Sequence, residues 1–130
     1  MDARLDPARI LGLEPGDAHV IRNAGGVVNA DALAALMISQ RLLGTERIKV
    51  IQHTNCGMAE VRPEDLEAEI VQETGTRPPF SIETIEDPET GVRAAVARIE
   101  ATEFLPCRDD VRGYVYDVTT GDLHEVVGGG

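Results

Sequence analysis

The stretch from residue 48 to residue 57, IKVIQHTNCG, decides the fold class of this chain. Its first five residues are rich in β-branched and apolar side chains, which is typical of a buried strand. The strand runs directly into His53 and Cys56, spaced as His-x-x-Cys. Reactive side chains directly after a buried strand indicate a site at the carboxyl edge of a sheet, where ligands gather in α/β proteins.

Helical and strand patterns alternate on both sides of this stretch. Helices are predicted over residues 7–11, 31–43, 63–73 and 88–101, and strands over 18–22, 48–52, 113–118 and 123–127. Asn29 or Asp31 can cap the second helix and Gly44 can end it, while Asp6-Pro7 and Asp87-Pro88 are typical helix starts. The order predicts an α/β fold with a mainly parallel sheet and flanking helices, closed by a C-terminal antiparallel hairpin.

Length and charge limit the classes of function. The 130 residues fit a single domain, residues 1–130. A net charge of −11, confined to residues 63–130, disfavours nucleic-acid binding. No apolar run approaches the roughly 20 residues of a membrane helix, and no secretory signal is visible. Two cysteines make no disulfide framework. We therefore expect a cytoplasmic protein that binds neither nucleic acid nor membrane.

The His53–Cys56 pair is a candidate metal site, because tetrahedral zinc commonly takes imidazole nitrogen and thiolate sulfur. Gly57 would let the backbone turn sharply beside the metal. The alternative is that both side chains are structural. Cys107 lies in a loop with no nearby histidine in the sequence, so a nucleophilic role for it is not expected. His19 and His124 are interpreted as packing or surface residues.

Two further segments are candidate functional clusters: one is a pair of opposite charges and the other is a glycine-rich run. Asp2 and Arg4 are two residues apart, so in an extended segment they share a side and can pair. They form either a bidentate, oriented pair or an exposed terminal ion pair of little energetic value. The run Arg22-Asn23-Ala24-Gly25-Gly26 could cradle an anion through its amides, or it could be a turn packed under the site.

Together these segments resemble the β-class carbonic anhydrases, most closely the short bacterial type. The resemblance covers nearly the whole chain and rests on the runs MDARLDP (1–7), HVIRNAG (19–25), ISQR (38–41), HTNCGM (53–58) and RGYVYDV (112–118). It implies zinc-dependent, reversible hydration of CO2 to bicarbonate by a zinc-bound hydroxide. The alternatives are a COS or CS2 hydrolase of the same family, or an inactive truncated remnant or interaction module.

The resemblance also implies roles for particular residues. Zinc would be held by a first Cys, by His53 and by Cys56, with Asp2 and Arg4 as the catalytic dyad and Asp2 as a further candidate zinc ligand. The motifs do not assign the residues that line the CO2 pocket; Gly57 is a candidate substrate contact, and Val27 and Val28 with a partner subunit are candidate lining residues. The family also implies a homodimer or higher homo-oligomer.

The chain departs from the family pattern at its start. The family's first Cys stands two residues before the dyad Asp, and Met1 occupies the position between them. That ligand and the central strand that carries it therefore fall outside the sequence, and we expect the natural polypeptide to begin earlier. Cys107 is not expected to replace the ligand, because it comes from a different loop.

Overall fold

The computed structural model describes residues 1–85 and 87–128. Its elements, in chain order, are α1 (Pro7–Leu11), the 3₁₀ turn η1 (Ala24–Gly26), α2 (Ala30–Leu43), β1 (Ile48–His53), the 3₁₀ turn η2 (Gly57–Ala59), α3 (Pro63–Thr74), α4 (Pro88–Glu100), β2 (Val111–Tyr116) and β3 (Leu123–Val127). The α/β class with flanking helices is confirmed.

The sheet has three strands in the order β1-β2-β3 within the described residues. β1 and β2 are parallel, with Ile48 opposite Val111 and His53 opposite Tyr116. β2 and β3 form the predicted antiparallel hairpin, with an irregularity in register between Gly113 and Tyr114. The sheet is therefore mixed, and β1 carries the His53 motif at its carboxyl end.

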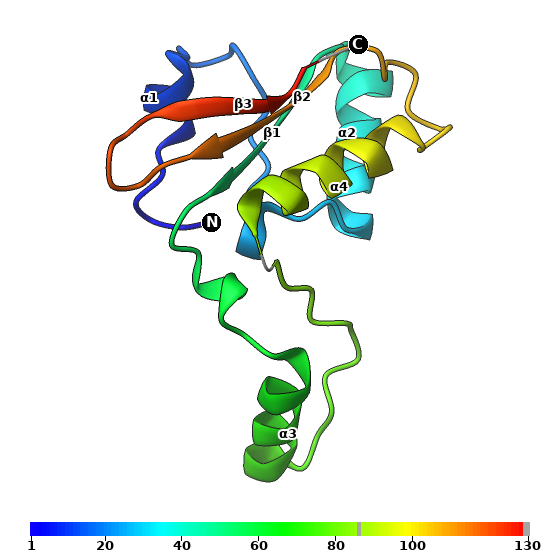
Figure 1. The fold of residues 1–130 in the computed structure, drawn as a ribbon. Coiled ribbons are helices and arrows are strands. Elements are labelled where there is room, and N and C mark those ends of the chain that lie inside the picture. Colours follow the sequence, from blue (N-terminus) through cyan, green and yellow to red (C-terminus); the bar gives the residue numbers. More distant parts are fainter. Residues whose placement is uncertain (86, 129–130) are drawn as a thin grey trace.

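Helix α4 covers one face of the sheet and builds the core (Figure 1). Its residues Val92, Val96 and Ile99 are at most 1% exposed, and they pack with Ile48, Val50, Leu105 and Val111. A Cβ on Gly113 would lie 2.2 Å from Cγ1 of Val92, so the glycine lets the helix approach β2 closely. Partly buried residues of α2 pack against the same cluster.

Local signals place the helix ends as the sequence predicts. The Asn29 and Asp87 side chains accept hydrogen bonds from backbone N–H groups in the first turns of α2 and α4. Gly44 and Gly75 end α2 and α3 in the left-handed conformation that glycine adopts without a steric penalty.

Two strand predictions differ from the structure. The prediction of a strand over residues 18–22 is wrong, because this segment pairs with no strand among the described residues. Val20 and Ile21 are 52% and 44% exposed there. A strand pattern needs a neighbouring ladder to become a strand, and apolar alternation alone does not supply one. The strand predicted over 113–118 starts two residues earlier, at Val111.

Helix α3 projects away from the sheet at the end of two extended connections (Figure 1). It has no fully buried residue. No helix in the described part of the chain is long and apolar enough to cross a membrane.

Candidate active site

The site begins with a carboxylate that Arg4 holds at both oxygens. Arg4 Nε donates to Asp2 Oδ1 at 3.0 Å and Nη2 donates to Oδ2 at 2.7 Å. The Arg4 backbone N–H adds a third bond to Oδ1 at 2.8 Å. Three donors from one residue fix the plane of the carboxylate, so the pair is bidentate and oriented, as one alternative predicted, while the Arg4 side chain is 50% exposed, as the other predicted.

This geometry sets the protonation state of Asp2. Hydrogen bonds from the Arg4 side chain, and then from its backbone N–H, hold the pKa of the Asp2 carboxyl well below its usual range. The pKa of Arg4 is raised in return, chiefly by the same side-chain bond. Asp2 is therefore an ionised acceptor throughout the neutral pH range.

His53 is buried and points its Nε2 atom toward this carboxylate. Its Nδ1 lies 2.7 Å from the Thr54 carbonyl oxygen, so Nδ1 carries the proton and donates. That bond leaves Nε2 as the free lone-pair nitrogen, 3.6 Å from Asp2 Oδ2. A metal-binding histidine is commonly oriented through its other ring nitrogen in this way. The acceptor was not identifiable from the sequence, because it is a backbone oxygen.

Thr54 is itself held in place by β2 and the residues that follow it. Its N–H donates to the Tyr116 carbonyl at 3.0 Å, which extends the β1–β2 ladder by one residue. Its Oγ1 accepts a bond from the Val118 N–H at 3.1 Å. The carbonyl that orients His53 is therefore fixed from two sides.

The donor atoms are of the types that zinc prefers, but among the described residues fewer than three such side chains lie close enough together to bind one ion. Two ligand atoms bound tetrahedrally at about 2.1 Å lie about 3.4 Å apart, close to the 3.6 Å between His53 Nε2 and Asp2 Oδ2. Cys56 contributes a buried free thiol from the same loop. No group of three or more His, Cys, Asp or Glu side chains in residues 1–85 and 87–128 is placed to hold a metal. His53 and Cys56 fit as part of a zinc site, with Asp2 beside them.

The sharp turn of this loop falls at Asn55. Asn55 has φ of +51°, the one positive φ among the described non-glycine residues. Gly57 does not have a positive φ, but it begins η2 and lies inside the tight turn that the Ala59 N–H closes on the Cys56 carbonyl at 3.0 Å. The Asn55 carbonyl accepts a bond from Arg4 Nη2 at 3.0 Å, which ties the dyad to the metal-binding loop.

The Arg22–Gly26 run contacts both the dyad segment and the backbone of β1. Arg22 donates to the carbonyl oxygens of Asp2 at 2.7 Å and Leu5 at 3.0 Å, so its guanidinium holds the dyad segment. Gly26 has φ of +61°, and a Cβ there would lie 2.8 Å from the Ile51 carbonyl oxygen. Of the two predicted roles, the packed turn is the one that these contacts favour.

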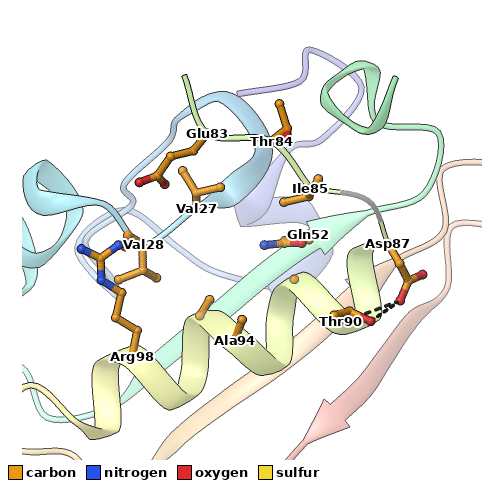
Figure 2. Close-up of a pocket in the computed structure, with 12 residues that line it drawn as sticks. Val27, Val28, Gln52, Glu83, Thr84, Ile85, Asp87, Thr90, Ala94 and Arg98 are labelled. Carbon is orange, nitrogen blue, oxygen red and sulfur yellow. Dashed lines mark hydrogen bonds between the residues drawn. The ribbon is translucent and has the colours of Figure 1, made fainter. Parts of the chain in front are cut away.

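A cavity of about 350 Å³ lies elsewhere, between the two residues that follow η1 (Val27 and Val28), α4, and residues 83–85 with Asp87 (Figure 2). Val27 and Val28 line it, and Asp2, Arg4, His53 and Cys56 do not. The Gln52 side chain faces this side of β1; its Nε2 donates to the Gly26 carbonyl at 3.2 Å, and its Oε1 has no partner among the described residues. The two valines expected to line the CO2 pocket therefore line a different hollow.

The remaining candidates take no part in this geometry. The backbone N–H and carbonyl of Cys107 are both bonded to the Gln40 side chain of α2. His19 Nδ1 lies 2.6 Å from Ser39 Oγ. His124 is exposed on β3.

An α/β domain with an arginine-held aspartate against a His-x-x-Cys loop defines a class of candidate metalloenzyme, and comparisons with known proteins identify the family. The family model described as carbonic anhydrase matches residues 1–77. β-Carbonic anhydrase 1 of Mycobacterium tuberculosis is 49% identical over 97% of this chain and 77% of its own length. A carbon disulfide hydrolase of an Acidianus strain is 33% identical over 96% of this chain and 73% of its own.

Solved structures agree with the sequence comparisons. The crystal structure of carbonic anhydrase from Streptococcus mutans superposes with a TM-score of 0.90 at 35% identity, covering 98% of this chain and 77% of that one. The chain belongs to the β-carbonic anhydrase family. The predicted family is confirmed.

Proposed function

We propose that this protein hydrates CO2 reversibly to bicarbonate, with Asp2 and Arg4 as the catalytic dyad. The observation that carries the proposal is the arginine-held Asp2 carboxylate, 3.6 Å from the free nitrogen of His53. The similarity to a β-carbonic anhydrase over 97% of the chain supports the same activity.

We further propose that His53 and Cys56 hold Zn²⁺, with Asp2 as a further candidate ligand. Bound zinc lowers the pKa of its water toward about 7, which makes a nucleophile available at neutral pH. The Thr54 carbonyl keeps the proton on His53 Nδ1, so Nε2 offers its lone pair to the metal. Ligation by Asp2 would require its Oδ2 to leave Arg4 Nη2, so the ligand and dyad roles of Asp2 exclude each other at any one time.

In the dyad role, Asp2 accepts a hydrogen bond from the O–H of the attacking hydroxide, whose formation from water has already released a proton to the solvent, and so orients the hydroxide lone pair toward CO2. Because the Arg4 bonds keep the pKa of Asp2 low, the carboxylate accepts this bond without taking the proton. Arg4 also prevents rotation of the carboxylate, which preserves the angle of attack. Gly57 adjoins Cys56 and is exposed, so it can contact substrate without a side chain in the way.

Stopped-flow measurement of CO2 hydration, combined with zinc analysis of the purified chain, tests the proposal. One zinc per chain and hydration far above the buffer rate are expected. Asp2→Ala should lower turnover while zinc is retained. Loss of zinc in Asp2→Ala would instead assign Asp2 as a ligand, and full activity in that variant would remove the dyad from the mechanism.

A second candidate activity is hydrolysis of CS2 or COS at the same site. It is favoured by the carbon disulfide hydrolase that is 33% identical over 96% of this chain. Both reactions need the same nucleophile, and they differ in the pocket shape and the access route that the substrate requires. Parallel assays with CO2, COS and CS2 decide between them, and preference for a sulfur substrate would displace CO2 hydration as the proposed function.

We also propose that the protein works in the cytoplasm as a homodimer or a larger homo-oligomer. Several large apolar side chains are exposed, namely Val20, Ile21, Leu42, Leu43, Phe80 and Phe104. Light scattering during size-exclusion chromatography tests this assembly, and a monomer at micromolar concentration would contradict it.

A further inference from the structure

We infer that Asn55 is a positioning residue for the Asp2–Arg4 dyad, acting through its backbone conformation and not through its side chain. The inference rests on the proposed function. It concerns how the loop between the two candidate zinc ligands holds the guanidinium of Arg4.

The first observation is conformational. Asn55 has φ of +51°, in the left-handed region that L-residues other than glycine seldom occupy. Asparagine and aspartate tolerate this region several-fold better than other residues with a Cβ, and β-branched residues tolerate it worst. The residue type at position 55 therefore matches a backbone conformation that most substitutions would strain.

The second observation is what the conformation achieves. The carbonyl oxygen of Asn55 accepts a bond from Arg4 Nη2 at 3.0 Å, although the two residues are 51 positions apart. The same Nη2 donates to Asp2 Oδ2 at 2.7 Å. Arg4 Nη2 therefore joins the dyad carboxylate to the loop. The position of this nitrogen depends on the direction in which the Asn55 carbonyl points.

The third observation concerns the side chain. Asn55 is exposed, and its amide makes no hydrogen bond among the described residues. The neighbouring Thr54 carbonyl accepts from His53 Nδ1, so two successive carbonyls of one loop orient a candidate metal ligand and the dyad arginine. A left-handed residue at position 55 turns the second carbonyl toward Arg4.

Three substitutions separate conformation from side-chain chemistry. Asn55→Val should resist the left-handed region and lower CO2 hydration by about tenfold with zinc content unchanged, since small misplacements of catalytic groups reduce rates strongly. Asn55→Gly and Asn55→Asp accept that region, so each should recover most of the turnover that Asn55→Val loses. Circular dichroism and zinc analysis confirm that each variant is folded and loaded.

A double-mutant cycle asks whether Asn55 acts through Arg4. In an Arg4→Ala background the carbonyl has no guanidinium to hold, so Asn55→Val should cause no further loss of turnover. A loss of the same factor in both backgrounds would show a general structural effect and would overturn the inference.

A measurement on the metal-free protein keeps this test separate from the proposed function. Hydrogen exchange of the Arg4 Nε–H, assigned in a ¹⁵N spectrum by its disappearance in Arg4→Lys, reports how firmly the guanidinium is held. It should be at least about threefold faster in Asn55→Val than in wild type, Asn55→Gly or Asn55→Asp. Unchanged exchange in Asn55→Val overturns the inference even if the enzyme is active. An inactive wild type with the expected exchange pattern would refute only the proposed function.

Discussion

The substitution Thr54→Val removes the hydroxyl that fixes the carbonyl against which His53 is oriented. Valine has nearly the shape of threonine, so packing is conserved and the lost feature is the Oγ1 acceptor at 3.1 Å from the Val118 N–H. The Thr54–Tyr116 backbone bond at 3.0 Å remains. The substitution therefore loosens the oriented carbonyl without breaking the ladder.

The magnitude follows from one hydrogen bond and one metal ligand. A backbone donor that loses its partner costs about 1–3 kcal/mol when fully buried, and this contact is only partly buried, so we expect about 1 kcal/mol. With a urea m-value of about 2 kcal/mol/M, the midpoint of unfolding falls by about 0.5 M. Changing a partner that orients a metal ligand typically weakens metal binding by about 10- to 100-fold, and we expect the lower value.

Urea unfolding of the metal-free protein and zinc competition with a chromophoric chelator measure the two effects. Thr54→Ser keeps the hydroxyl and is the matched control, with zinc affinity within about twofold of wild type. The reasoning is refuted if Thr54→Val binds zinc as tightly as wild type, or if Thr54→Ser weakens binding as much as Thr54→Val does.

Three further predictions concern the dyad, the core and the metal. Since the pKa of Asp2 is depressed in the folded state, its stabilising effect is present above the ordinary value of 3.8 and is lost as pH falls through the folded pKa. The difference in unfolding free energy between wild type and Asp2→Asn should thus be constant from about pH 5 to 8 and shrink only below about pH 4 in acid titrations; shrinkage near neutrality would contradict this. Gly113→Ala, whose Cβ would lie 2.2 Å from Val92 Cγ1, should destabilise the fold by about 1–3 kcal/mol in urea unfolding, and an unchanged midpoint would show that α4 is less tightly packed. Dialysis against dipicolinate should abolish CO2 hydration and zinc should restore it, whereas activity that survives complete zinc removal would exclude the metal role.

The helices were the most predictable part of the fold. The predicted bounds of α2, α3 and α4 all agree with the structure within one residue, and of the two capping candidates for α2 it is Asn29 that caps the helix. Capping side chains, proline in the first turn and glycine after the last turn act between residues close in sequence. Such signals need no knowledge of the rest of the chain.

The strands were less predictable, because a strand exists only beside another. β1 and β3 lie within one residue of their predicted ranges, whereas β2 is shifted and residues 18–22 form no strand among the described residues. The sequences of these segments are similarly rich in β-branched and apolar residues. Their different outcomes depend on which backbone lies alongside.

For the candidate site, the residue types and their spacing were readable from the sequence. The sequence alone determined the helix caps, the strand that leads into His53, and the family that the Asp2-x-Arg4 and His53-x-x-Cys56 motifs carry. Only the tertiary structure decided that Asp2 lies 3.6 Å from His53 and that backbone carbonyls of Thr54 and Asn55 orient His53 and Arg4. The physical reason is that every residue has the same carbonyl group, so its role depends on where the folded backbone directs it.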